Sequence, residues 1–239
     1  MSINSFSSMQ SLVNKRGAAA AAGPVSITNL AAPGPISPFY YLTPTTTIKS
    51  ANNQIIGCTC VVTNQTSPYT FMNGTYIMSS SCLTTQNSNG GTLAFAFSGD
   101  SSGDIMQSPS TYNSSGSYTG SVATVTSGTT IYGEWMQVQL PYTLTVTTYS
   151  IISAVPSGGP SWATMVPKSF YLCGSNDGTT WTTVDNRTGF SPSTSVGPNH
   201  FTAPTQSVGY KYFRLVGTQI GTGTFLRMGC ALGIQGSGM

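Results

Sequence analysis

The chain has 239 residues, of which 38% are hydrophobic and only 5% are charged, whereas an ordinary soluble domain has about 25% charged residues. The net charge of +3 comes from scattered bases with a single adjacent pair, Lys15 and Arg16. No basic patch for phosphate groups is present, so we exclude nucleic acid as a partner. The length allows one large β domain, alone or with an arm.

Residues 1–48 differ from the rest and are predicted to form an Ala/Pro-rich N-terminal arm. Five prolines between Pro24 and Pro44 forbid a continuous helix and favour extended backbone. Two interpretations stay open: a disordered tail, or an arm that lies on a neighbouring subunit of a homo-oligomer. Apolar residues favour the second, because a solvated tail lacks them. They are Ile27, Leu30, Ile36, Phe39, Tyr40, Tyr41 and Leu42.

Targeting signals are not evident in the sequence. Residues 1–10 have no basic start, and the alanine run at 18–22 ends at Gly23 and Pro24. No stretch approaches the ~18 apolar residues of a membrane span. We therefore expect synthesis in a cytosol and, if the protein leaves, export by assembly or lysis.

From residue 49 to residue 239 the pattern predicts one all-β domain. β-branched and aromatic runs recur between Gly, Ser and Asn clusters, without helical periodicity. This spacing of strands is typical of a jelly-roll β-sandwich. The predicted strands cover residues 54–62, 69–79, 92–98, 121–125, 133–140, 144–154, 169–174, 180–184, 200–201, 210–217 and 225–234. Long polar loops are predicted at 84–91, 99–120, 156–167 and 188–199.

Residues 168–185 form the clearest element, a β-hairpin. Phe170 and Leu172 alternate with Tyr171 and Cys173, which is the period of a half-buried strand. The turn falls on residues 176–178, where Asn, Asp and Gly tolerate positive φ.

The segment at 174–181, GSNDGTTW, resembles the hairpin signature of the discoidin family, the coagulation-factor C-type domains with a galactose-binding-like jelly roll. Further segments are similar to that family in the same order. They lie at 68–74, 133–141, 149–152, 210–216 and 231–236. The resemblance covers roughly residues 50 to 236 and implies a ligand site in loops at one end of the sandwich. Residues 82–132 are hard to place on the family pattern, and the disulfide that joins the ends of many extracellular members is not evident in the sequence.

Five cysteines, an odd number, leave at least one thiol free or paired between chains. Cys58 and Cys60 would point to one face of a strand and could begin a metal site, but no second motif completes a zinc site. Cys173 and Cys230 lie in strand patterns and are interpreted as small buried hydrophobes.

Few residues could support catalysis, so we predict no enzymatic activity. His200 is the one histidine, and no nucleophile motif lies beside it. Glu134 is expected to pair with Arg214. Asp100 and Asp104 share a loop that could hold Ca²⁺, although two acids are few for such a site and a solvated loop is the simpler interpretation. No other cofactor is expected.

Aromatic residues in or beside loops are the candidates for ligand binding. Flat rings beside amides and hydroxyls suit sugars, whose apolar faces stack on the ring. The alternative is that these rings pack under the loops. They are Tyr69, Tyr112, Tyr118 and Trp162.

Two functions remain. The first is a structural component of a virus particle (minor capsid, vertex, fibre or tail protein) that binds other virion proteins through its arm. Low charge, the arm, the lack of a signal and the odd cysteine motivate it, as does a likeness to structural proteins of large DNA viruses and phages. The second is a carbohydrate-binding module or adhesin that contacts host glycans. Both can hold together, because a jelly roll on a virion can also touch glycans.

Overall fold

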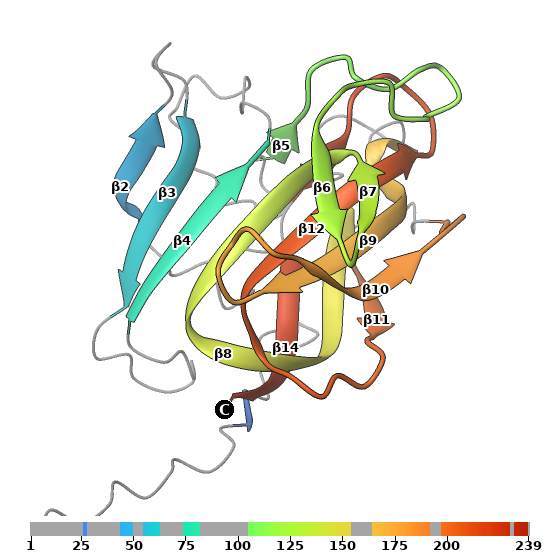
Figure 1. The fold of residues 1–239 in the computed structure, drawn as a ribbon. Coiled ribbons are helices and arrows are strands. Elements are labelled where there is room, and N and C mark those ends of the chain that lie inside the picture. The colour runs from blue at the N-terminus through green and yellow to red at the C-terminus, as the bar shows by residue number, and fades with distance from the viewer. Residues whose placement is uncertain are drawn as a thin grey trace, which may run out of the picture.

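The computed structural model describes residues 26–27, 44–49, 55–62, 74–81, 105–153, 164–191, 197–229 and 232–238. Within these ranges the chain forms antiparallel strands and two 3₁₀ residues, at 164–165. The predicted all-β jelly-roll sandwich is confirmed, and Figure 1 shows how its strands are arranged.

One layer is a broad sheet in the order β10-β9-β12-β8-β4-β3-β2. Each strand pairs antiparallel with its neighbour, as expected where one face is packed and the other faces outward. The bounds are β10 Thr182–Arg187, β9 Pro167–Ser175, β12 Tyr210–Ile220, β8 Glu134–Ser153, β4 Gly74–Ser80, β3 Ile55–Val62 and β2 Pro44–Lys49.

The second layer forms around the later half of β8, which bends in a wide U between the layers (Figure 1). That half pairs with β11 (Gly197–Thr202) and β14 (Leu232–Gly238), and β14 pairs with β1 (Ser26–Ile27). The sequence predicts two strands separated near Pro141, whereas the structure has one continuous strand. Gln139 is opposite Tyr212 and Ile77, and Leu144 is opposite Tyr210 and Gly238, whereas the residues between them have no ladder partner. Pro141 therefore falls where no ladder donor is needed.

The core lies between the two halves of β8. Met136 and Val138 from the first half share one buried cluster with Val146 and Ile151 from the second. Aromatic rings fill its centre: Tyr149 stacks on Phe201 at 5.1 Å between ring centroids, and Phe170 meets Phe201 edge-on at 5.3 Å. Alternation along each strand thus sends one set of side chains inward and leaves the other on the outer face.

The predicted hairpin at 168–185 is confirmed as β9 and β10. Phe170 and Leu172 are fully buried, and Gly178 has a φ of +75°, which its missing Cβ permits. Cys173 is also fully buried, as the interpretation of a small buried hydrophobe requires. Cys230 lies outside the described residues.

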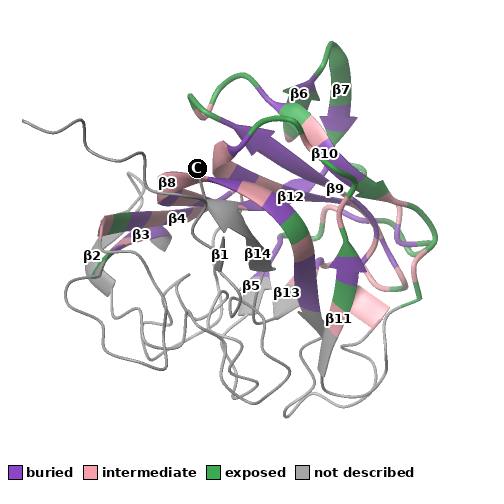
Figure 2. Ribbon diagram, turned by 90° about the horizontal axis from the view of Figure 1, so that it is seen from below, coloured by how far each residue is buried: buried purple, intermediate pink, exposed green. Residues whose placement is uncertain are grey.

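Two small sheets complete the fold. β5 (Ile105–Gln107) pairs with β13 (Arg227–Gly229), and β6 (Ala123–Thr126) forms a hairpin with β7 (Thr129–Tyr132). Figure 2 shows this hairpin over the side of the sheet that holds β9, β10 and β12. The described part of the region that the sequence left unplaced, 105–132, therefore packs on the sandwich.

Two segments of the predicted arm are strands of this chain's own sheet. β1 contains Ile27 and pairs with β14, and β2 pairs with β3. The other apolar residues named for the arm lie outside the described residues, so the arm's role in assembly stays a prediction. No helix in the described ranges has the length and apolar character needed to cross a membrane.

Candidate functional site

The outward side chains of β8 and β12 lie in register on the outer face of the sheet. Gln137 is opposite Arg214, and Gln139 is opposite Tyr212. On the other side of β8, Gln139 is opposite Ile77 of β4. Cross-strand partners lie within contact distance, so these residues form one surface.

Arg214 is held between two indole rings on this face. Its guanidinium carbon lies 4.0 Å from the Trp135 ring centroid and 4.1 Å from the Trp181 ring centroid. Cation–π attraction of this kind contributes about 0.5–2 kcal/mol per contact, more where water is excluded. A planar guanidinium can stack on both rings at once, which a lysine ammonium cannot do.

Hydrogen bonds fix the same guanidinium in its plane. Nε and Nη2 donate to Oε1 of Gln137 at 3.1 and 2.7 Å, and Nη1 donates to Oγ1 of Thr124 at 3.0 Å. Because Oε1 of Gln137 faces the arginine, its Nε2 group points away. Nε2 has no hydrogen-bond partner among the described residues.

The expected ion pair between Glu134 and Arg214 is not formed. The Glu134 carboxylate accepts hydrogen bonds from the hydroxyls of Ser81 (2.6 Å) and Tyr118 (3.3 Å). Among the described residues, Arg187 and Asp185 form the one ion pair, at 2.8 Å. The prediction fails because Glu134 and Arg214 point to different sides: Glu134 precedes Trp135, whose side chain takes the outward position on β8.

Burial lowers the pKa of Arg214 to about 10. No carboxylate of the described residues pairs with the guanidinium, so the desolvation that disfavours its charged form is not compensated by an ion pair within them. The pKa stays well above neutrality, so Arg214 remains a cation held by rings and an amide rather than by an anion.

The β6–β7 hairpin covers one part of the outer face. Ile131 packs with Cys173, Trp181 and Val216 in a second buried cluster, separate from the core between the layers. Thr126 joins this contact through a 3.0 Å hydrogen bond between its hydroxyl and that of Thr183. The hairpin thus closes over the arginine stack from one side.

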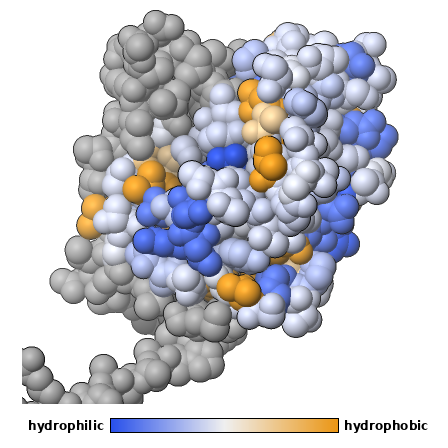
Figure 3. Space-filling view, in the orientation of Figure 1, coloured by the Kyte–Doolittle hydropathy of each residue, from blue (hydrophilic) through white to orange (hydrophobic). Residues whose placement is uncertain are grey.

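Beyond the hairpin, no described segment covers the outer face, and we call this part the amide–tyrosine surface. It consists of Gln137, Gln139 and Tyr212, with Ile77 and Ser79 beside them, all half-buried. Figure 3 shows hydrophilic side chains gathered over β8 and the turn between β9 and β10 on this face.

Tyr212 lies across that turn because Gly178 has no side chain. A Cβ on Gly178 would come within 3.2 Å of the tyrosine ring. Neither the Tyr212 hydroxyl nor the Gln139 amide has a hydrogen-bond partner among the described residues. Together with Nε2 of Gln137, the surface therefore offers an aromatic ring and several unused donors and acceptors side by side.

The tyrosines proposed from sequence are placed differently. Tyr112 is only 2% exposed, and its hydroxyl donates to the Gly217 carbonyl at 2.7 Å. Tyr118 stacks edge-on against Tyr112 at 5.2 Å and accepts from the Val122 N–H at 3.0 Å. These two rings therefore support the loop at 108–122 and do not form an open ligand surface.

The other residues proposed from sequence fall outside the described residues. They are Tyr69, Trp162, Asp100 and Asp104, so the sugar-binding role of the first two and the calcium site of the last two stay predictions. Within the described residues no group of three or more His, Cys, Asp and Glu side chains is close enough to hold a metal ion.

Asp177, Asp185 and His200 have partners within the fold. The Asp177 carboxylate accepts from the backbone N–H groups of Thr179 and Thr180, both at 2.7 Å, within the hairpin turn. Asp185 accepts from Arg187 and from the Tyr149 hydroxyl. Nδ1 of His200 lies 2.8 Å from the Ser150 hydroxyl.

Sequence reasoning missed the amide–tyrosine surface because it searched loops. The available signal was the alternation of Trp135, Gln137 and Gln139 along a predicted strand. That pattern places amides and an aromatic ring on the non-core face. The alternation does not predict which strand pairs with this one, so it does not place Arg214 and Tyr212 opposite Gln137 and Gln139.

No protein-family model and no curated protein match the chain. Among solved structures, the chain is similar to CpGH89CBM32-5 of Clostridium perfringens in complex with GalNAc-β-1,3-galactose, with 11% identity, 64% of this chain and 89% of that chain covered, and a TM-score of 0.44. It is also similar to the family 32 carbohydrate-binding module of NanJ from C. perfringens in complex with galactose, with 13% identity, 64% and 88% covered, and a TM-score of 0.43. A third is the family 32 module of AlyQ in complex with 4,5-unsaturated mannuronic acid, with 15% identity, 67% and 91% covered, and a TM-score of 0.38.

Proposed function

We propose that the chain is a non-catalytic glycan-binding domain that holds a saccharide on the amide–tyrosine surface. The observation that carries the proposal is the placement of Gln139 opposite Tyr212. Both are half-buried on the outer face of the sheet. Among the described residues, neither the Gln139 amide nor the Tyr212 hydroxyl has a hydrogen-bond partner. A sugar ring can lie against the tyrosine while its hydroxyls bond to the amides.

The arginine stack supports this proposal by fixing one of the amides in advance. Two bonds from Arg214 hold Gln137, so its Nε2 donors are oriented before a ligand arrives. Preorganised groups lose less conformational entropy on binding, which favours recognition of a weakly bound, polar ligand.

Binding without chemistry also fits the carboxylates of the sandwich. Glu134, Asp177 and Asp185 each accept hydrogen bonds within the fold, and none lies on the amide–tyrosine surface. The role in a virus particle, with virion partners and oligomers, has no support from the comparisons and stays a prediction from composition.

The test is a glycan array with the full-length chain, followed by affinity measurements on the best glycan. Tyr212→Ala and Gln139→Ala should each weaken binding, by about tenfold if the lost interaction is worth about 1.4 kcal/mol. The matched control is Tyr132→Ala, because Tyr132 is a tyrosine 56% exposed on β7, outside the surface. An array without any binding would refute the proposal, and binding that survives both substitutions would place the sugar elsewhere on the chain.

A further inference from the structure

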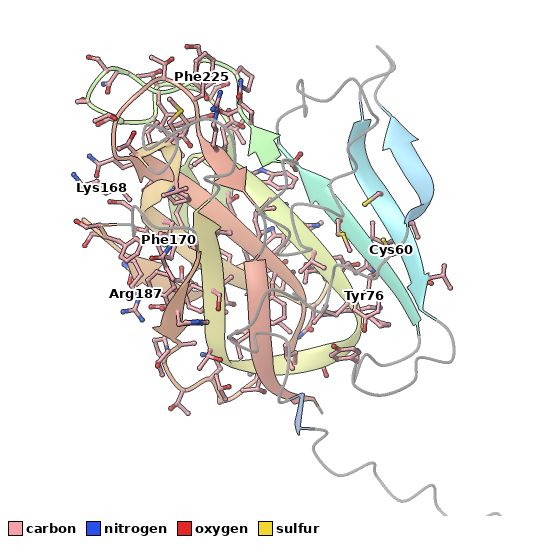
Figure 4. The ribbon with its side chains drawn as sticks, turned by 180° about the vertical axis from the view of Figure 1, so that it is seen from behind. Cys60, Tyr76, Lys168, Phe170, Arg187 and Phe225 are labelled. Atoms are coloured by element: carbon pink, nitrogen blue, oxygen red, sulfur yellow. The ribbon has the colours of Figure 1, made fainter. Side chains whose placement is uncertain are left out.

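Three sulfur-containing side chains, those of Cys58, Cys60 and Met78, lie on the inner face of β3 and β4. Cys58 is the direct cross-strand partner of Met78, and its Sγ lies 3.9 Å from the Met78 Sδ. Cys60, two residues further on the same strand, points to the same side and shares a hydrogen bond with Cys58. Figure 4 shows Cys60 between β3 and β4, with sulfur atoms beside it. All three residues are fully buried, and the two cysteines are reduced.

The distance between the sulfurs of Cys58 and Met78 suits a three-coordinate ion. With metal–sulfur bonds of about 2.3 Å, three ligands around a trigonal ion lie about 4.0 Å from one another. The 3.9 Å between Cys58 and Met78 is close to that value. Little movement of either side chain is therefore needed to hold an ion between them.

Ligand chemistry selects the metal. Zinc sites take four ligands, usually thiolates and imidazoles, whereas the described residues hold no cluster of three or more His, Cys, Asp and Glu side chains. Thiolates combined with a thioether are soft donors, and soft donors select Cu(I). The third ligand is a methionine, which explains why a cysteine–histidine pattern in the sequence does not reveal the site.

We infer that Cys58, Cys60 and Met78 form a binding site for a soft monovalent cation, Cu(I), or Ag(I) as its analogue. Each metal–thiolate bond replaces one S–H bond and releases one proton, with no change of oxidation state. The first such bond leaves the site neutral, because one thiolate balances one monovalent cation. A second thiolate would give the complex a net charge of −1, so in the neutral complex the donors are one thiolate, one thiol and the thioether. This neutral complex avoids the large cost of a net charge in a buried position.

Without metal, Cys60 is a neutral thiol. The hydrogen bond with Cys58, together with burial, raises the pKa of Cys60 above its usual range. The site is near the margin of its sheet, since β3 lies next to the terminal strand β2. Local opening of edge strands costs less than global unfolding and gives the ion a route to the sulfurs.

The test is an anaerobic titration of the reduced, full-length chain with Cu(I) against a chromophoric Cu(I) chelator. We expect a binding site that Cys58→Ala and Cys60→Ala abolish, with sulfur-only coordination at the bound metal by X-ray absorption. Met78→Leu conserves volume and should keep the fold while weakening the affinity by at least about tenfold, through loss of one ligand. A thermal melt of each variant without metal shows whether it is folded.

Cys173→Ala is the matched control, because Cys173 is equally buried but packs in the other cluster, against Trp181 and Val216. It should leave the affinity unchanged. The inference is overturned if the wild-type chain takes up no Cu(I), if Met78→Leu binds as tightly as wild type, or if binding persists when Cys58 and Cys60 are both replaced.

Discussion

The guanidinium of Arg214 lies 4.0 Å from the ring of Trp135, on the neighbouring strand, and it donates no hydrogen bond to a carboxylate within the described residues. In a chain with 5% charged residues, this half-buried cation depends on two rings, one amide and one hydroxyl. The stack joins Trp135 of β8 and Arg214 of β12 to Trp181, the residue before β10. The hydrogen bonds of Arg214 also fix the Gln137 amide. The stack therefore contributes to stability and to the proposed glycan surface together.

Replacing Arg214 by lysine should destabilise the fold by about 2 kcal/mol. An ammonium keeps the charge but loses the stacking on two rings and the paired bonds to Gln137. Urea unfolding followed by tryptophan fluorescence measures this directly, because two of the three tryptophans flank the arginine. Lys211→Arg, a substitution that also keeps the charge, should change stability by less than about 0.5 kcal/mol. If Arg214→Lys and wild type have equal free energies of unfolding, the stacking of Arg214 on the two tryptophans does not stabilise the fold.

The sequence predicts most of the strands because alternation reports the face that packs on the core. Phe170 and Leu172, for example, are buried as their pattern requires. It does not predict what covers the other face. Cys173 and Val216 are outward residues, and they are buried in a cluster with Trp181 and with Ile131 of the β6–β7 hairpin. That contact joins residues far apart in the chain, and no local periodicity records it.

Single residues show the same limit at the candidate site. Glu134 and Arg214 could be paired from charge alone, yet strand direction sends them to different partners. Tyr112 could be read as a loop ring for a sugar, yet its hydroxyl is taken by the Gly217 carbonyl. Which hydrogen bonds are already satisfied depends on tertiary contacts, and this decides whether a polar residue is free to bind a ligand.

Tyr149→Phe should make the fold less stable at neutral pH but less sensitive to alkali. The Tyr149 hydroxyl donates to the buried Asp185 carboxylate at 2.7 Å, and a hydrogen bond to a charged group contributes about 1.5–3 kcal/mol. Burial, and then the bond to Asp185, raise the pKa of Tyr149 above its usual 10.0. In the unfolded chain this tyrosine ionises near its usual value, so its contribution is complete below that pH and is lost as the pH rises beyond it.

Urea unfolding of both proteins at about pH 7 and at about pH 10.5 tests this linkage. The stability gap between wild type and Tyr149→Phe should narrow at the higher pH. Tyr132→Phe, on an exposed tyrosine, serves as control and should not alter the pH profile. A gap that is constant across this range would mean that Tyr149 titrates alike in both states.

Asp177→Ala should destabilise the hairpin turn above the usual carboxyl pKa. Backbone N–H groups of Thr180 and Thr179 hold the pKa of Asp177 below its ordinary 3.8. A depressed pKa contributes stability above the ordinary value, and this contribution disappears as the pH falls through the folded value. The gap between wild type and Asp177→Ala, measured by thermal melts, should therefore shrink below pH 3.8. Asp177→Asn, which keeps one acceptor oxygen, should be less destabilised, and a gap that widens in acid would contradict the argument.

Two glycines with nearly equal backbone angles allow steric overlap to be separated from backbone strain. Gly116 has a φ of +79° and Gly128 a φ of +82°, so alanine at either site costs about 1–2 kcal/mol from its left-handed backbone. A Cβ on Gly116 would overlap the carbonyl oxygen of Ile220, whereas a Cβ on Gly128 would meet nothing within 4 Å. Overpacking adds about 1–3 kcal/mol.

Gly116→Ala should therefore lower the free energy of unfolding by about 1–3 kcal/mol more than Gly128→Ala does. Urea unfolding of the two variants under the same conditions measures this difference. The atom that a Cβ on Gly116 would overlap is a backbone atom, the carbonyl oxygen of Ile220. The Ile220 N–H also donates to the Gly116 carbonyl at 2.8 Å, and this hydrogen bond joins the 108–122 loop to the end of β12. Backbone cannot move aside as a flexible side chain can, so relief would require breaking that bond. If the two substitutions cost the same, the loop is not held against β12 in solution, and the Tyr112–Gly217 contact beside it would be lost as well.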